Sequence, residues 1–444
     1  MDLATLVDKV QAAGIVGAGG AGFPTHVKLN NRCETVLVNA AECEPLLQVD
    51  QQLLKQEAQA LVKTLALVVE ATGAGKGIFG VKAKYEAALA ILEQAVAALD
   101  LHQGKLEIAR LGDFYPAGDE QVLVYEVLGK VVPQGGIPLQ VGVIVLNVET
   151  LLNISRALNH EAVTHKYVTV AGAVANPVTV KVPLGTPINS VLGLAGGSTV
   201  AHFRVLEGGP MMGKEVYDLE RGVTKTTKGL IVLPAEHRLW RKKDVPSSTM
   251  LKRAMSVCCQ CSACTDLCPR HLLGHTIEPH RILRSLVHHV GSDFKGLTGA
   301  QFCSECAVCD VYACVMDISP RQLNAAVKRE LGKQGFRQAP GGEGKPSSQR
   351  ELRKIPIKRL IPRLGLESYH KPAPLSSREF EPDQVRLELK QHVGLPCTPV
   401  VEPGARVTAG VLVAEVPSGQ LGSRIHASIT GTVLQVAPQI VIAR

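Results

Sequence analysis

Two cysteine-rich stretches organise this chain: residues 258–269 read CCQCSACTDLCP, and residues 303–314 read CSECAVCDVYAC. Each contains three cysteines at two-residue intervals, a spacing that lets three thiolates bind three irons of one cubane. Zinc sites more often use separated CxxC pairs, so the triplets favour two [4Fe–4S] clusters, with two zinc ions as the alternative. The eight predicted ligands are Cys258, Cys261, Cys264, Cys268, Cys303, Cys306, Cys309 and Cys314.

The fourth cysteine of such a motif often ligates the other cluster of a two-cluster ferredoxin. We therefore expect crossed ligation, in which Cys314 joins the first triplet and Cys268 joins the second. The second motif has four residues instead of three before its last cysteine, and no proline follows Cys314. Cys314 is thus the ligand that departs from the pattern, and Cys259, next to Cys258, is the alternative ligand.

Composition and charge limit the classes of protein that this chain can belong to. Its 444 residues suggest about three domains. Twelve cysteines in a chain without a basic leader predict a reduced, cytoplasmic protein. The sequence contains no run of about 18 apolar residues, so we expect no membrane-spanning helix. Ten Lys and Arg residues lie in the segment 333–371, so most of the net charge of +8 is concentrated there. Without interleaved aromatic residues, it does not indicate nucleic-acid binding.

The pattern of apolar residues changes along the chain. Strands at 35–39, 78–81, 106–111 and 141–147 alternate with helices at 3–13, 50–71, 82–99 and 121–128, which predicts an α/β domain. Short β segments and one helix at 188–195 follow up to residue 235, and then a helical region carries the cysteines. Residues 333–380 are basic and rich in Pro and Ser, which predicts a solvated linker that is partly extended. The remainder reads as all-β.

A glycine-rich loop near the start, GAGGAGFPTHVK at 17–28, is a weak signal by itself. Such a loop lets the backbone approach a phosphate or ring and turn free N–H groups toward it. Three strings follow in order: VNAAECEP at 38–45, YPAGDE at 115–120 and NVETLLN at 147–153. Together the four strings resemble the flavin- and NADH-binding subunit of respiratory complex I.

They resemble still more closely the C subunit of the Rnf electron-transport complex, with TKTTKG at 224–229 and RLGLESYHKPAPL at 363–375. The C-terminal segment is similar to the barrel-sandwich hybrid module related to lipoyl and biotinyl domains, without their modified lysine. That module is N-terminal in the Rnf subunit. Here it is C-terminal, as in the cobalamin reductases of propanediol-utilising bacterial microcompartments.

This resemblance covers almost the whole chain and implies a multidomain α/β architecture. The implied parts are a Rossmann-like FMN- and NADH-binding domain at 1–162, a β-grasp (SLBB-like) module at 163–240, a helical ferredoxin domain with two [4Fe–4S] clusters at 249–332, the basic linker at 333–380 and a barrel-sandwich hybrid domain at 381–444.

The resemblance also implies roles for individual residues. The implied flavin-binding residues are Gly17, Gly19, Gly20 and Gly22 under the phosphate and ring, Phe23 as a stacking aromatic, Lys28 and Asn39 near the flavin, Tyr115, Gly118, Asp119 and Glu120 over it, and Asn147 and Thr150 at its phosphate. Glu42 and Glu44 align with acidic residues near flavin and nicotinamide. No residue is implied as a catalytic proton donor.

Three departures weaken the implied NADH site more than the FMN site. Ala18 stands where complex I has an arginine, Ala41 where it has an aspartate, and Asp119 where it has a glutamate. Ordinary structural roles are the alternative for several of the implied residues: Asn39 and Asn147 could cap strand ends, Lys28 could be a solvated lysine, and Glu42 and Glu44 could be loop carboxylates.

The implied function is electron transfer from NADH through FMN and the two clusters to cobalamin, which would regenerate coenzyme B12 during propanediol utilisation. A flavin joins a two-electron donor to one-electron clusters because it is stable in three redox states. The implied partners are a corrinoid adenosyltransferase and shell proteins, and the implied location is inside a cytoplasmic microcompartment. The alternatives are an Rnf-type subunit of a membrane complex and a redox carrier without NADH oxidation of its own.

Overall fold

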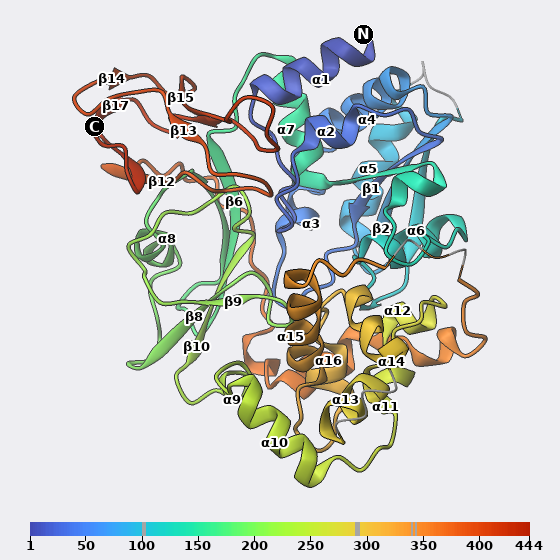
Figure 1. Ribbon diagram of the computed structural model, residues 1–444. Coiled ribbons are helices and arrows are strands. Elements are labelled where there is room, and N and C mark those ends of the chain that lie inside the picture. Colours follow the sequence, from blue (N-terminus) through green and yellow to red (C-terminus); the bar gives the residue numbers. More distant parts are fainter. Residues whose placement is uncertain (100–103, 289–293, 339–340, 342–343) are drawn as a thin grey trace.

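The computed structural model describes residues 1–99, 104–288, 294–338, 341 and 344–444 (Figure 1). Its first domain is built on a parallel sheet in the order β3-β2-β1-β5. Alternate residues of its central strand enter the cores on opposite faces, as Val36 and Leu37 do. Both faces are therefore covered, as a parallel sheet requires. The strands are β1 (Thr35–Ala40), β2 (Lys76–Lys82), β3 (Leu106–Leu111) and β5 (Val143–Asn147).

Helices cover this sheet unequally. The core on one face contains residues of α1 (Leu3–Ala12), α2 (Thr25–Leu29), α3 (Val49–Gln56), α4 (Ala58–Thr72), α5 (Glu86–Ala97) and α7 (Val148–Leu158). The other face packs against α6 (Glu120–Leu128). The single helix predicted over 50–71 is wrong, because the backbone leaves helical geometry at Glu57. The helix predicted from residue 82 begins at Glu86, because Lys82 continues β2.

A five-stranded sheet forms the second module, in the order β7-β6-β10-β8-β9. Its central pair, β6 and β10, is parallel, and the other neighbours are antiparallel. Its own core includes apolar residues of the helix α8. The elements are β6 (His165–Gly172), β7 (Val178–Pro183), α8 (Ile188–Leu194), β8 (Phe203–Glu207), β9 (Lys214–Val216) and β10 (Gly229–Pro234).

The cysteine region is helical and lies below the first domain in Figure 1. Short helices alternate with loops that carry most of the cysteines, as the sequence predicted, whereas Cys264 and Cys309 lie in helical turns. The helices are α9 (Arg238–Lys243), α10 (Ser247–Val257), α11 (Ala263–Asp266), α12 (Pro269–Leu272), α13 (Pro279–Val287), α14 (Phe294–Thr298) and α15 (Pro320–Lys333), with a 3-10 turn at Gly299–Phe302 and a π-helical turn at Val308–Ala313.

The prediction that 333–380 is a solvated linker is wrong for its middle part. Strand β11 (Ile355–Pro356) pairs with β4 (Phe114–Tyr115), and α16 (Ile357–Leu364) follows at once. Its apolar residues recur at helical spacing and are buried, whereas the basic residues between them are exposed. The segment is thus an amphipathic helix with one apolar face. Its many basic residues led to the incorrect prediction of a linker. The buried residues are Ile357, Leu360, Ile361 and Leu364.

The C-terminal module consists of two small sheets, in the orders β12-β18-β17-β14 and β13-β15-β16. Its apolar residues, such as Val413 and Ile442, belong to the same core as one face of the first domain. In the part of the chain that the structure describes, no helix is long and apolar enough to cross a membrane. The strands are β12 (Gln384–Glu388), β13 (Thr398–Pro399), β14 (Arg406–Val407), β15 (Leu412–Glu415), β16 (Ile425–His426), β17 (Gly431–Gln435) and β18 (Gln439–Ala443).

Candidate functional site

The glycine-rich loop closes on itself before α2. The Gly17 N–H donates to the Phe23 carbonyl at 2.9 Å, and the Ala18 N–H donates to the Thr150 hydroxyl at 2.9 Å. Gly20 has a φ of +115°, and a Cβ built there would meet no atom within 4 Å. A Cβ on Gly19 would come no closer than 3.6 Å to Asn147. The loop backbone is therefore open at Gly20, which leaves room for a ligand.

Two of the predicted asparagines lie next to each other at the carboxyl ends of adjacent parallel strands. Asn39 of β1 is in register with Asn147 of β5. The Asn39 side chain donates to the Gly118 carbonyl at 2.8 Å, and the Asn147 side chain accepts from the Glu149 N–H at 3.0 Å as the cap of α7. Both therefore have structural roles, at the edge of an open parallel sheet where ligands commonly bind.

Lys28 is not a solvated lysine. Its Nζ pairs with Glu120 at 2.9 Å and donates to the Val145 carbonyl at 3.0 Å. Asp119 caps α6 through the Gln121 N–H and pairs with Arg270, at 2.8 Å, in the cysteine region. The YPAGDE string is thus fixed both to the sheet and to the cysteine region.

The side chains of the two predicted acidic residues, Glu42 and Glu44, accept hydrogen bonds from backbone N–H groups. Glu42 accepts from the Asp50 N–H at 3.2 Å, and Glu44 accepts from the Met211 and Met212 N–H groups at 2.9 and 2.8 Å. Burial raises the pKa of Glu42 to about 7, and burial also raises the pKa of Glu44. Because its partners are backbone groups of the second module, Glu44 fixes that module to the first domain.

Glu42 and Glu44 also line a cavity of about 530 Å³ at the ends of β1 and β2. Its walls come from α3, from Tyr85 directly before α5, from the first residue of α16 and from the segment after α16. Lysines gather around it: Lys55, Lys82, Lys84 and Lys371. Lys82 is buried and pairs with Asp113 at 3.0 Å, whereas Lys371 is exposed. The cavity therefore combines an acidic floor with a partly exposed basic wall.

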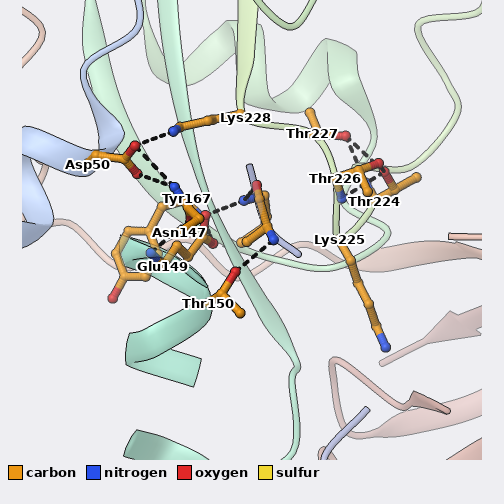
Figure 2. A network of polar contacts seen from close by, with 12 residues as sticks. Asp50, Asn147, Glu149, Thr150, Tyr167, Thr224, Lys225, Thr226, Thr227 and Lys228 are labelled. Atoms are coloured by element: carbon orange, nitrogen blue, oxygen red, sulfur yellow. Dashed lines mark hydrogen bonds and ion pairs between the residues drawn. The ribbon is translucent and has the colours of Figure 1, made fainter. Parts of the chain in front are cut away.

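A buried polar network behind the glycine-rich loop was missed by the sequence analysis (Figure 2). Asp50 accepts from both Asn147, at 3.0 Å, and Lys228. Lys166 pairs with Glu149 and donates to the Ala18 carbonyl at 3.1 Å. Although burial alone would lower the pKa of Lys228, the Asp50 and Glu42 carboxylates raise it.

Two residues of this network lie in strings that the sequence analysis had singled out: Glu149 in NVETLLN and Lys228 in TKTTKG. Nothing in the sequence indicated that the two strings meet. Figure 2 shows that Lys225, from the same TKTTKG string, points away from Asp50. Its Nζ donates to the carbonyls of Gly14 at 2.6 Å and Arg424 at 2.5 Å, and burial lowers its pKa to about 7.

The cysteines surround two separate cavities. The first, of about 260 Å³, is lined by Cys258, Cys259, Cys261, Cys264 and Cys314. The second is lined by Cys268, Cys303, Cys306 and Cys309, all of which are buried. The last cysteines of the two motifs thus lie with the opposite triplets, as crossed ligation requires. Cys259 is exposed but belongs to the first group, so it stays the alternative to Cys314.

The two cysteine loops have the same backbone shape. Gln260 and Ser262 in the first loop and Glu305 and Ala307 in the second all have positive φ, between 52° and 65°. Left-handed residues at equivalent positions curl each loop around its cavity. Among the described residues, no three His, Cys, Asp or Glu side chains converge closely enough for a single metal ion.

A direct contact joins the two halves of the site. The Tyr115 hydroxyl donates to the Cys306 carbonyl at 2.8 Å, and both residues are buried. Burial raises the pKa of Tyr115 well above its ordinary value, so the hydroxyl stays protonated and remains a donor. The YPAGDE string is therefore in contact with Cys306, which lines the second cysteine cavity.

Sequence models of four domain families match successive parts of the chain. They are the Nuo51 FMN-binding domain over 10–156, the SLBB domain over 167–215, a 4Fe-4S dicluster domain over 257–319 and the RnfC barrel sandwich hybrid domain over 371–444. The multidomain architecture predicted from the sequence is confirmed, as are the FMN-binding and [4Fe–4S] cluster domains. The zinc alternative is set aside.

Whole-chain comparisons agree with these matches. The chain is 44% identical over 443 residues to the cobalamin reductase PduS of Citrobacter freundii, covering 99% of this chain and 96% of that protein. It is 45% identical over 435 residues to the protein of that name from Salmonella typhimurium strain LT2, covering 98% and 95%. The C subunit of the Na⁺-translocating ferredoxin:NAD⁺ oxidoreductase complex of Acetobacterium woodii is 35% identical over 278 residues, covering 61% and 59%.

A solved structure shares the fold. The NAD⁺-reducing [NiFe]-hydrogenase in the H2-reduced state aligns with a TM-score of 0.50 and 20% identity, covering 76% of this chain and 67% of that chain. At that identity the likeness concerns the arrangement of the backbone alone.

Proposed function

Because this chain belongs to the family of the PduS cobalamin reductases, we propose that it transfers electrons from NADH to cobalamin. Oxidation of one NADH to NAD⁺ releases two electrons and one proton. The two electrons reduce two molecules of cob(III)alamin to cob(II)alamin, or two of cob(II)alamin to cob(I)alamin. FMN held by the first domain would supply two-electron chemistry and clusters held by the cysteines would supply one-electron chemistry, which would reconcile the donor with the acceptor.

In this proposal FMN lies at the carboxyl end of the parallel sheet, next to the glycine-rich loop. The open space at Gly20 and the adjacent side chains of Asn39 and Asn147 support it. The residues that would hold FMN are Gly17, Gly19, Gly20, Gly22, Phe23, Lys28, Asn39, Tyr115, Gly118, Asp119, Glu120, Asn147 and Thr150. The Lys28–Glu120 pair keeps two of these side chains in place before any ligand binds.

NADH would approach from the cavity that Glu42 and Glu44 line. Its lysines suit the pyrophosphate of a dinucleotide, because a cluster of ammonium groups favours an anion. Because burial raises the pKa of Glu42 to about 7, this carboxyl repels the anion less than an ordinary carboxylate would. The absence of the complex I arginine and aspartate at Ala18 and Ala41 then matters less.

The cluster ligands would be crossed, with Cys258, Cys261, Cys264 and Cys314 on the first cluster and Cys268, Cys303, Cys306 and Cys309 on the second. Burial raises the pKa of Cys264 and Cys268 to about 12, so their thiols stay protonated until iron binds. The observation that best supports electron transfer from the flavin to the clusters is the hydrogen bond from the Tyr115 hydroxyl to the Cys306 carbonyl. It joins the string that would hold FMN to Cys306, which would be a ligand of the second cluster.

Stopped-flow mixing of anaerobic holoprotein with NADH tests the proposal. We expect flavin bleaching, then loss of cluster absorbance, and then cob(II)alamin formation when cob(III)alamin is present. Bleaching without cobalamin reduction would contradict cobalamin as the acceptor. An unbleached flavin, in protein whose clusters dithionite reduces normally, would favour a redox carrier without NADH oxidation of its own.

An Rnf-type role is the second candidate, supported by the 35% identity to the Acetobacterium woodii protein. We propose instead that the protein works inside a bacterial microcompartment and passes its product to a corrinoid adenosyltransferase, with shell proteins as neighbours. Pull-down from cells that form microcompartments separates the two. Recovery with membrane subunits, and not with the adenosyltransferase or shell proteins, would favour the Rnf-type role.

A further inference from the structure

The two cysteine cavities differ in their access to solvent. All four cysteines at the second cavity are buried, whereas Cys261 at the first is exposed and Cys258 and Cys314 are half-buried. The second cavity also contacts the flavin-binding string through Tyr115. Electrons that enter from the first domain therefore meet the enclosed site first, and the open site is the one that an acceptor can reach.

Exposed apolar side chains surround that open site. Met255 and Val257 lie on the last turn of α10, directly before Cys258, and Val315 and Met316 directly follow Cys314. Their exposed fractions are 52, 37, 71 and 37%. Met255, Val315 and Met316 also line the first cavity. We call these four residues the apolar collar. Three of them line one cavity, and exposed apolar side chains grouped in this way indicate a surface that contacts a ligand.

Basic residues stand around the collar. Arg284 lines the first cavity and is exposed, and so is Lys252 on α10. Arg363 donates to the Cys314 carbonyl at 3.5 Å. The nearby acidic residue Asp317 is already paired with Lys242 at 3.1 Å. The surroundings of the collar therefore favour an anionic group next to an apolar body.

We propose that the corrinoid substrate docks on the apolar collar, with Arg284 and Lys252 receiving its phosphodiester; this rests on the proposed function. A corrin ring is edged with methyl groups, and the nucleotide loop of cobalamin carries one phosphodiester. Guanidinium groups bind phosphates through paired hydrogen bonds. Four apolar side chains are too few for a stable protein interface, which takes about 20–30 residues a side. They match the edge of a small macrocycle.

Binding of cyanocobalamin to the oxidised holoprotein, measured by equilibrium ultrafiltration without NADH, tests the site independently of turnover. In the double variant Met255→Gln/Val315→Ser we expect the Kd to rise at least about tenfold, equivalent to 1.4 kcal/mol. The KM for cobalamin should rise in parallel, while flavin reduction by NADH stays unchanged. The matched control is Val411→Ser, since Val411 is 48% exposed in the C-terminal module.

The phosphodiester contact has its own test. Arg284→Gln should weaken cobalamin at least about threefold but leave cobinamide, which lacks the nucleotide loop, unchanged. If the wild-type protein reduces cobalamin and both variants bind it normally, the docking site is wrong and the proposed function stands. If the wild-type protein is reduced by NADH but neither binds nor reduces any corrinoid, the proposed function fails, and the docking site with it. Loss of an acidic protein partner alone in the collar variants would also overturn the corrinoid site.

Discussion

The Tyr115 hydroxyl and the Cys306 carbonyl form a buried hydrogen bond of 2.8 Å between the first domain and the cysteine region. Tyr115→Phe should leave that carbonyl without a partner and lower the free energy of unfolding by about 1–3 kcal/mol. It should also slow cluster reduction after NADH mixing, because the contact between the two parts loosens. Denaturant titration and stopped-flow absorbance measure the two effects. Tyr217→Phe is the control, since Tyr217 is 86% exposed; equal effects in both variants would contradict this role.

If ligation is crossed, as we propose, Cys268 and Cys306 are ligands of the same cluster. Cys268→Ser and Cys306→Ser should each leave about four irons, and the double variant should still hold about four, because one [4Fe–4S] cluster is lost in every case. Uncrossed ligation would leave the double variant with almost none. Iron and sulfide analysis after anaerobic reconstitution decides between them. Cys259→Ser should keep both clusters, and a loss there would make Cys259 the ligand in place of Cys314.

Gly19 offers a test of the FMN position that spares the fold. A Cβ at this position would come no closer than 3.6 Å to another atom, and the φ of Gly19 is not positive, so Gly19→Ala should fold normally. If FMN lies against the loop, the added methyl group occupies its space, and flavin content should fall at least fivefold. Gly193→Ala in α8, where a Cβ would meet no atom within 4 Å, is the matched control. Full FMN content in Gly19→Ala would place the cofactor elsewhere.

The ion pair between Asp119 and Arg270 links the same two parts as Tyr115 does. Both side chains are about nine-tenths buried, with exposed fractions of 11 and 12%. A double-mutant cycle with Asp119→Asn and Arg270→Gln should give a coupling energy of about 1–3 kcal/mol. Asparagine keeps the oxygen that caps α6, so the cycle reports on the pair itself. Additive losses would show that the pair contributes little to holding the cysteine region in place.

Lys225 should make stability depend on pH. Its pKa falls from 10.5 to about 7 on folding, because burial disfavours the charged form. Between these values the unfolded chain binds more protons than the folded one, so the free energy of unfolding should rise with pH, by up to about 1.4 kcal/mol per unit. The contribution of Lys225 to the free energy of unfolding is complete above pH 10.5 and is lost as the pH falls toward 7. Lys225→Met should lack this rise.

Urea titrations of the holoprotein at about pH 7, 8 and 9 measure the slope. Other groups, such as Lys243, titrate equally in both proteins, so the difference between them isolates Lys225. Lys333→Met is the control, because the Lys333 side chain is 76% exposed. If Lys225→Met and the wild type have the same slope, Lys225 is charged in the fold.

Local sequence was sufficient to predict the two cysteine motifs and the alternating strands and helices of the first domain. Thiolate spacing is set within a few residues, and apolar periodicity reports directly on the buried face of each element. The prediction failed where apolar and charged residues alternate closely. The ten basic residues in and around α16 suggested a solvated linker, although Leu360 and Leu364 are completely buried. The order of the modules along the chain was also readable, and it distinguished this family from the Rnf subunits.

Contacts between modules were decided by the tertiary structure alone. No spacing rule relates Tyr115 to Cys306, Asp119 to Arg270, or Lys225 to the carbonyls of Gly14 and Arg424, since 191, 151, 211 and 199 residues separate these partners. They meet because apolar cores shared between modules fix how whole domains pack. The cysteine sequence therefore determined that the chain binds clusters, whereas the packing decided which cysteine cavity contacts the YPAGDE string and which one opens to solvent.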